Sequence, residues 1–170
     1  MSAKNIRLIA LVAVMMAVTA TLTLVVKVPI PATGGYIHLG DLAANFAALA
    51  FGPWLGALIA GGGMAIADLI GFPPFAPGTL VVHGLQAVVV GYLGRRARPW
   101  MMFVAALAGG VVVVVGYFLY EWIFMQMGVA TAVKEIPFNI IQVLSGLVGV
   151  PVYVLVAQSY PPIKRWAEKS

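Results

Sequence analysis

Long apolar runs, separated by short segments that contain proline or glycine, dominate this sequence. A helix needs roughly 20 mainly apolar residues to cross a bilayer, and the run from residue 6 to residue 26 already has that length. Hydrophobic residues make up 62% of the 170 residues and charged residues 9%, whereas soluble domains have about 25% charged residues. Mean hydropathy is +1.03. We therefore expect an all-α integral membrane protein with a single membrane domain over residues 1–170.

The proline and glycine positions divide the chain into six expected transmembrane helices in a compact bundle. Their approximate bounds are 6–26, 41–51, 53–71, 79–94, 99–127 and 137–159. The second is too short to cross a bilayer alone, because a helix rises only about 1.5 Å per residue. We expect the proline-containing segments 27–35 and 72–78 to be loops, because proline cannot continue a helical hydrogen-bond ladder.

The distribution of lysine and arginine predicts the orientation of the chain. With the N-terminus inside, eight of the ten basic residues fall on the inner face: Lys4, Arg7, Arg95, Arg96, Arg98, Lys164, Arg165 and Lys169. Only Lys27 and Lys134 fall outside. Basic residues gather on the cytoplasmic side of membrane proteins, so both termini are expected to be cytoplasmic. This arrangement explains the net charge of +5 better than nucleic-acid binding does.

Polar residues collect away from the expected turn at Phe51-Gly52-Pro53-Trp54. In the predicted topology the outer halves of the helices hold Asp41, Asn45, Asp68, His83, Gln86, Glu121, Asn139 and Gln142. The inner halves are almost entirely apolar or glycine. Ionisable residues inside a membrane are costly and are functional by default. The pattern predicts a polar cup that opens to the outside.

Carboxylate, amide, imidazole and aromatic groups together suit a flat heterocycle that forms hydrogen bonds. The candidate substrate-binding residues are Glu121, Asn139, Gln142, His83, Tyr36, His38, Asp68, Tyr117, Trp122 and Phe75. Simpler interpretations stay open for some of them. Asp68 and His83 could serve packing between helices, and the aromatic and imidazole side chains of 36, 38 and 75 could belong to an interfacial belt.

A stripe of small residues marks the first expected helix. Ala10, Ala13, Ala17 and Ala20 recur at three- and four-residue steps, and such stripes allow close helix contact in membranes. The stripe either packs internally or forms a docking face for another membrane protein.

Several segments resemble the substrate-binding S components of energy-coupling factor (ECF) transporters. The resemblance rests on Gly34-Gly35-Tyr36-Ile37-His38-Leu39-Gly40-Asp41, on Phe51-Gly52-Pro53 followed by a Gly/Ala-rich helix to Ala67-Asp68, on Ala76-Pro77-Gly78, and on Pro137-Phe138-Asn139-Ile140-Ile141-Gln142. The spacing of Ala13 and Ala17 is similar to the AxxxA contact motif of that family.

This resemblance implies a subunit that captures a vitamin or vitamin precursor at the plasma membrane of a prokaryote. It also implies association with a transmembrane coupling protein (T component) and two cytoplasmic ATPases, with Ala13 and Ala17 on the docking face. The chain has no Gly-x-x-x-x-Gly-Lys phosphate loop, so ATPase activity is expected in partner subunits. No cofactor, metal or nucleic acid is expected.

The residue types favour one class of substrate but do not identify a single compound. A buried carboxylate suits a ligand that offers donors or positive charge, such as hydroxymethylpyrimidine, thiamine or a B6 vitamer, and riboflavin is the second choice. Two readings of another class stay open, a membrane enzyme and a self-sufficient secondary carrier. The absence of an HExxH pair counts against the enzyme, and the absence of an evident internal repeat counts against the carrier.

Overall fold

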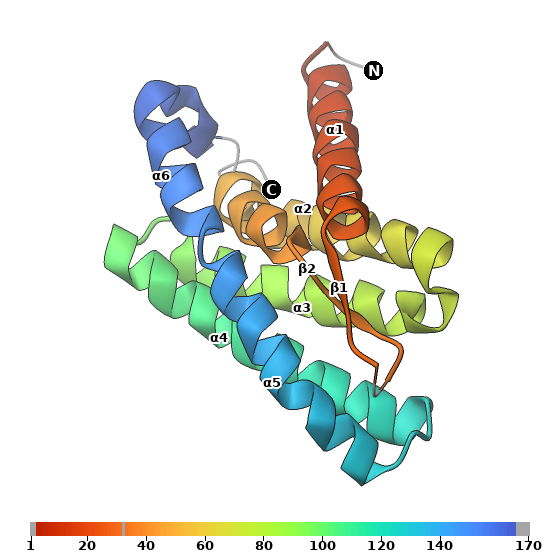
Figure 1. Ribbon diagram of the computed structural model, residues 1–170. Coiled ribbons are helices and arrows are strands. Elements are labelled where there is room, and N and C mark those ends of the chain that lie inside the picture. The colour runs from red at the N-terminus through yellow and green to blue at the C-terminus, as the bar shows by residue number, and fades with distance from the viewer. Residues whose placement is uncertain (1–2, 32, 166–170) are drawn as a thin grey trace.

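The computed structural model describes residues 3–31 and 33–165, which form a helical molecule with one small β-hairpin (Figure 1). In chain order the elements are α1 (Ala3–Val25), β1 (Lys27–Pro29), β2 (Tyr36–His38), α2 (Gly40–Gly71), the 3₁₀ helix η1 (Pro73–Phe75), α3 (Ala76–Gly94), α4 (Pro99–Leu119), the π-helical turn η2 (Tyr120–Phe124), α5 (Val129–Gly146), α6 (Gly149–Ser159) and the 3₁₀ helix η3 (Pro161–Arg165). The hairpin departs from the all-α prediction.

Five helical stretches of the described chain, not the six predicted, are long and apolar enough to cross a membrane. They cover residues 5–25, 40–71, 73–94, 99–124 and 129–159. The predicted count was wrong because the expected helices 41–51 and 53–71 belong to one element, α2. The first of them is too short to count as a span of its own.

The chain nevertheless turns sharply inside α2. Gly52 has φ 82° and ψ −176°, which lies outside the helical region and is a conformation that only glycine adopts readily. A Cβ on Gly56 would lie 2.7 Å from the Cα of Ala48, whereas residues eight apart in a straight helix are about 12 Å apart. The two parts of α2 therefore fold back against each other, at the turn that the Gly-Pro pair predicts.

The ends of the other helices also differ from the predicted bounds. α5 begins at Val129 and includes Pro137 in its interior, because membrane helices tolerate proline where neighbours satisfy the freed backbone groups. The predicted helix 137–159 is interrupted between Gly146 and Gly149. The expected loop 72–78 forms η1 and the first turn of α3.

The β-hairpin brings the segment that follows α1 over the helical bundle. Its strands pair antiparallel, with Val28 opposite Ile37, and the turn is closed by the Ile30 N–H, which donates to the Gly35 carbonyl at 2.8 Å. Side chains two apart on a strand share one face. Tyr36 and His38 therefore point the same way, toward the helices beneath.

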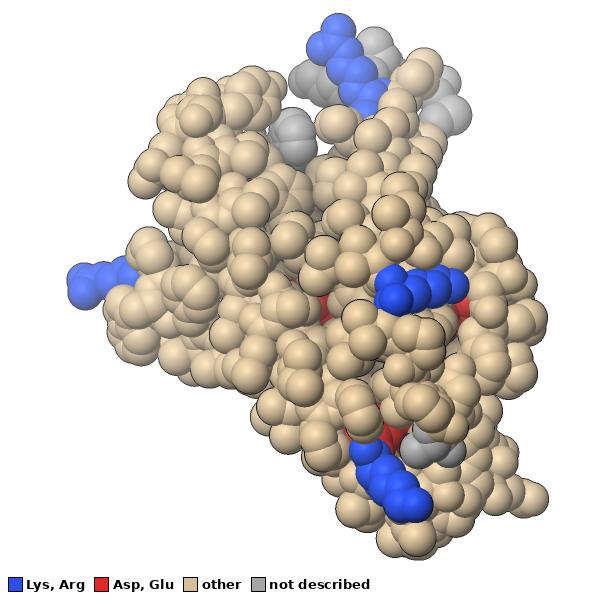
Figure 2. Space-filling model, viewed as in Figure 1, with Lys and Arg blue, Asp and Glu red and all other residues tan. Residues whose placement is uncertain are grey.

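Charged side chains are sparse on the molecular surface. Figure 2 shows isolated basic side chains on a largely uncharged face, with acidic groups visible only in recesses. Asp41, Asp68, Glu121 and Glu135 are all buried. Many large apolar side chains point outward, including Val14, Leu69 and Val111, which suits contact with lipid.

Candidate ligand-binding site

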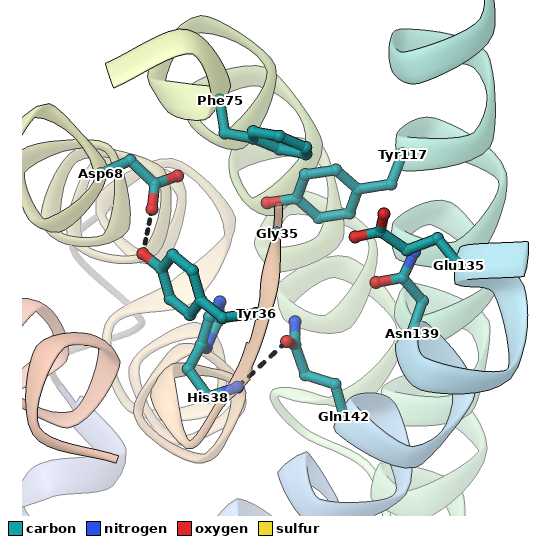
Figure 3. A pocket seen from close by; sticks show the side chains of 9 residues that line it. All are labelled: Gly35, Tyr36, His38, Asp68, Phe75, Tyr117, Glu135, Asn139 and Gln142. Carbon is teal, nitrogen blue, oxygen red and sulfur yellow. Dashed lines mark hydrogen bonds between the residues drawn. The ribbon is translucent and has the colours of Figure 1, made fainter. Parts of the chain in front are cut away.

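A small polar cavity of about 20 Å³ lies beneath the β-hairpin (Figure 3). It is enclosed by β2, the end of α2, η1, α4 and α5. The lining residues are Gly35, Tyr36, His38, Asp68, Phe75, Tyr117, Glu135, Asn139 and Gln142. The hairpin, the end of α2 and the start of α5 lie on the side of the molecule opposite the α3–α4 connection (Figure 1).

Hydroxyl groups hold the carboxylate of Asp68 on one wall of the cavity. The Tyr36 hydroxyl donates to Oδ1, and the Thr79 hydroxyl donates to Oδ2 at 2.5 Å. The Tyr117 hydroxyl lies 2.7 Å from the Thr79 oxygen and is the donor, because the Thr79 proton already points to Asp68. Burial, together with the hydrogen bond to Asp68, raises the pKa of Tyr36. Tyr36 therefore stays a neutral donor.

Helix α5 supplies the opposite wall with three residues on one face. Glu135, Asn139 and Gln142 follow one another at steps of four and three residues, which places them on one side of a helix. All three are buried. Gln142 Oε1 accepts a hydrogen bond from the backbone N–H of His38 at 3.3 Å, which ties the hairpin to α5.

Glu135 and Glu121 form a pair of buried carboxyl groups at this wall. Glu121 comes from the π-helical turn η2 and is fully buried, and its carboxyl is close enough to Glu135 to share a hydrogen bond when one group holds a proton. If both groups are ionised, three of their oxygen atoms have no hydrogen-bond partner among the described residues: both oxygens of Glu121 and Oε2 of Glu135. No Lys or Arg of the described chain forms an ion pair with either group. Apart from a proton that the two groups can share, the pair therefore has acceptor atoms without a partner among the described residues.

A second polar network is next to His38, one of the residues that line the cavity. His83 Nδ1 and Gln86 Oε1 are 2.6 Å apart, and Gln86 Nε2 donates to Asp41 Oδ1 at 2.6 Å. The N–H of Gly40 donates to His38 Nδ1 at 3.1 Å. His38, Asp41 and His83 lie near enough together to hold a metal ion. The Gly40 contact disfavours this use, because it leaves the imidazole proton of His38 on Nε2, the only other possible ligand atom.

The structure brings seven of the ten predicted site residues together around this cavity. They are Tyr36, His38, Asp68, Phe75, Tyr117, Asn139 and Gln142. Glu121 and His83 do not line the cavity. The His83 ring is nevertheless 5.7 Å from that of His38, which does line it. Trp122 is 43% exposed and contacts Phe118 at 5.7 Å between ring centroids, because η2 turns Glu121 inward and its neighbour outward.

Glu135 lines the cavity but was not among the predicted site residues. The last helix was predicted to start at 137, so that Lys134 and Glu135 were expected in a loop. The spacing of Glu135 from Asn139 and Gln142 is the signal that would have included it. Ala13 and Ala17, predicted for docking, both lie exposed on α1.

Comparison with known proteins agrees on one family of transporters. The family model for the S component of the ECF-type riboflavin transporter matches residues 3–158. The thiamine precursor transporter HmpT of Lactococcus lactis subsp. cremoris (strain MG1363) is 33% identical over 151 residues, which cover 87% of this chain and 86% of that protein. An uncharacterized protein of Pyrococcus woesei is 37% identical over 133 residues, covering 78% of this chain and 88% of that protein.

Solved structures show the same fold. The S component of a bacterial ECF transporter superposes with a TM-score of 0.69 at 21% identity, covering 93% of this chain and 96% of that one. The S component for biotin from an ECF-type ABC transporter gives a TM-score of 0.66 at 16% identity, covering 100% and 96%. The chain is a multi-pass membrane protein and a transporter subunit, not an enzyme, and it belongs to the ECF-type riboflavin transporter S component family.

Proposed function

We propose that this S component captures a single-ring, nitrogen-containing vitamin or precursor, of the pyrimidine or pyridine type. Hydroxymethylpyrimidine, thiamine and the B6 vitamers belong to this class. The observation that carries the proposal is the Glu135 carboxyl in the cavity wall, backed by Glu121, with no ion-pair partner among the described residues. A buried carboxyl group is stabilised by a ligand that donates hydrogen bonds or carries positive charge.

The other lining groups match the remaining features of such a ring. Asn139 lies next to Glu135 on the same wall, where its amide can donate to or accept from a ring nitrogen. Phe75 and Tyr117, with ring centroids 6.2 Å apart, offer aromatic faces to a flat ligand. The relative named as a thiamine precursor transporter supports the same class.

The size of the cavity favours a small ligand. A volume of about 20 Å³ is close to what one water molecule requires, so any vitamin must displace lining side chains or the hairpin. A single ring requires less displacement than the fused rings and ribityl chain of riboflavin.

Riboflavin is the second candidate. The family model that matches the chain is the riboflavin-transporter model, and the aromatic side chains of the cavity could stack on a flavin ring. In that case the ribityl hydroxyl groups would donate to Glu121 or Glu135.

S components of ECF transporters work with a T component and ATPases. We extend this to the present chain: a T component docks on α1, where Ala13 and Ala17 are exposed and permit close helix approach, and two cytoplasmic ATPase subunits supply the energy. Both ends of the chain face the cytoplasm of a prokaryotic cell, in agreement with the excess of basic residues on that side.

Binding titrations on the detergent-purified protein test the proposed ligand class. We expect hydroxymethylpyrimidine, thiamine or a B6 vitamer to bind more tightly than riboflavin. Glu135→Gln should weaken binding by about tenfold or more, because a hydrogen bond to a charged group contributes roughly 1.5–3 kcal/mol. Lys134→Gln is the matched control, because Lys134 is adjacent and exposed, and it should bind as the wild type does.

Two results would count against this assignment. Tight binding of riboflavin without binding of any single-ring vitamin would transfer the assignment to the flavin. Unchanged affinity in Glu135→Gln, with the ligand bound, would show that this carboxyl group does not recognise it.

A further inference from the structure

A second and larger cavity lies far from the ligand-binding site, between the α3–α4 connection and α6. Its volume is about 470 Å³, which falls within the range of small-molecule sites. The α3–α4 connection is at the left of Figure 1, whereas the hairpin and the α4–α5 connection are at the lower right. Neither the predicted capture of a vitamin nor the docking of a T component on α1 uses this cavity.

The walls of this cavity differ in chemistry. Arg95 and Arg96 form a basic wall with Gln158 beside them, and Met102 and Val154 form an apolar one. Arginine binds phosphate in a bidentate way, so the basic wall suits a phosphate group and the apolar wall suits hydrocarbon.

The start of α4 adds to the positive potential. Pro99, its first residue, lines the cavity, and no side chain within residues 3–31 or 33–165 caps the first turn. The N-terminal end of a helix carries partial positive charge and favours anions. This partial charge adds to the positive charge of the two arginines and would not form an anion site without them.

Exposed aromatic residues indicate the depth of the cavity in the membrane. Tyr92 and Trp100 lie on either side of the arginine segment and are 58% and 63% exposed. Trp54, which is 60% exposed, contacts Tyr92 edge to face at 6.1 Å between ring centroids. Exposed Trp and Tyr gather at the headgroup level of a bilayer, so the cavity lies at the depth of lipid phosphates.

We propose that this cavity binds a phosphate-bearing anion, namely the phosphodiester headgroup of an anionic phospholipid. Arg95 and Arg96 contact the phosphate, while Met102 and Val154 contact the glycerol and the first methylene groups. Basic pockets between membrane helices bind anionic headgroups in this manner. The lipid would fasten the α3–α4 connection to α6 and anchor this end of the molecule at the interface.

Native mass spectrometry of the intact protein tests the proposal. The protein is released from micelles that contain either phosphatidylglycerol or phosphatidylcholine. Wild type should retain one phosphatidylglycerol, with roughly tenfold preference over phosphatidylcholine. The double variant Arg95→Gln/Arg96→Gln should lose this preference. Arg98→Gln, in the same connection but outside the cavity lining, is the matched control and should keep it.

Further experiments distinguish a lipid phosphate from free phosphate, and a loss of binding from a loss of folding. If inorganic phosphate alone raises the Tm of wild type but not of the Arg95/Arg96 variant, the anion site stands and its ligand is free phosphate. The variant Arg95→Lys/Arg96→Lys keeps the charge, so an intermediate retention in a protein of unchanged Tm supports bidentate binding. Equal retention of the two lipids by wild type, or equal loss in Arg98→Gln, would overturn the proposal.

Discussion

Asp68 shows how polar groups are accommodated at the cavity. Its carboxyl accepts hydrogen bonds from Tyr36 and Thr79, so each of its two oxygen atoms has a donor within the protein. Glu135 differs, because its Oε2 atom has no partner among the described residues. An unsatisfied buried acceptor costs about 1–3 kcal/mol, and a bound ligand that donates to it removes this cost. Under the proposed function, this contrast favours Glu135 as the group that recognises the ligand and Asp68 as a structural group.

His38 provides a prediction about pH. Burial, and then the neighbouring His83 and Lys27, lower the pKa of His38 well below its usual value. As the pH falls below about 6.5, the unfolded chain binds a proton that the folded protein does not bind, so stability decreases by up to roughly 1.4 kcal/mol per pH unit. The loss continues until the pH reaches the lowered pKa of the folded state.

Thermal unfolding of wild type and His38→Gln between pH 7.5 and 5.5 measures this effect. Glutamine can still accept from the Gly40 N–H but does not titrate, so the Tm of the variant should fall less with pH than that of wild type. Parallel Tm curves for the two proteins would show that His38 is not responsible.

Many residues around the cavity could be predicted from the sequence, because polar side chains are rare in membrane helices and their depth can be estimated from the helix ends. Asp68, Asn139 and Gln142 were found in this way. Glu135 was missed because Pro137 indicated a helix start, and Trp122 was misplaced because the π-helical turn η2 has no evident sequence signal. In both cases local backbone geometry decides which way a side chain points.

The turn within α2 sets how the two parts of α2 and the helix α3 pack together. Gly91 of α3 approaches it so closely that an added Cβ would lie 2.6 Å from the Cα of Pro53. The turn therefore fixes both the fold-back within α2 and the contact between α2 and α3.

Gly52→Ala tests the importance of this turn. The φ of 82° and ψ of −176° are nearly forbidden to alanine and should cost about 1–3 kcal/mol, lowering the Tm in detergent. Gly84→Ala is the matched control: its new Cβ would meet only the Ala57 carbonyl oxygen at 4.0 Å, and alanine favours a helix by up to about 1 kcal/mol. A Tm equal to wild type in Gly52→Ala would show that the turn relaxes without cost.

Proline and glycine predicted element positions well where they coincide with chain reversal. The Gly52-Pro53 turn and the ends of the helices near Gly94 and Pro99 follow this rule. The hairpin was not predicted, because its strands of three residues are too short to show an alternating pattern. Pro137 gave a wrong helix start, because it lies inside α5 and not at a chain reversal.

The two cavities occupy opposite ends of the whole molecule and have opposite chemistry. Carboxyl and amide groups surround the small one, and arginine residues line the large one. A tightly packed apolar core includes Ala47, Ala48 and Ile59, which are fully buried. Under the proposed function, the ligand binds near one face of the bilayer, and its release inside the cell requires partner subunits.

Capture of a single-ring vitamin can be tested by mass spectrometry of the small molecules that are released when the purified, detergent-solubilised protein is denatured. We predict a pyrimidine or pyridine compound in stoichiometric amount from wild type and much less from Glu135→Gln. Release of a flavin from wild type would contradict the proposed ligand. If nothing is released and no vitamin of a panel raises the Tm, the capture function itself is contradicted.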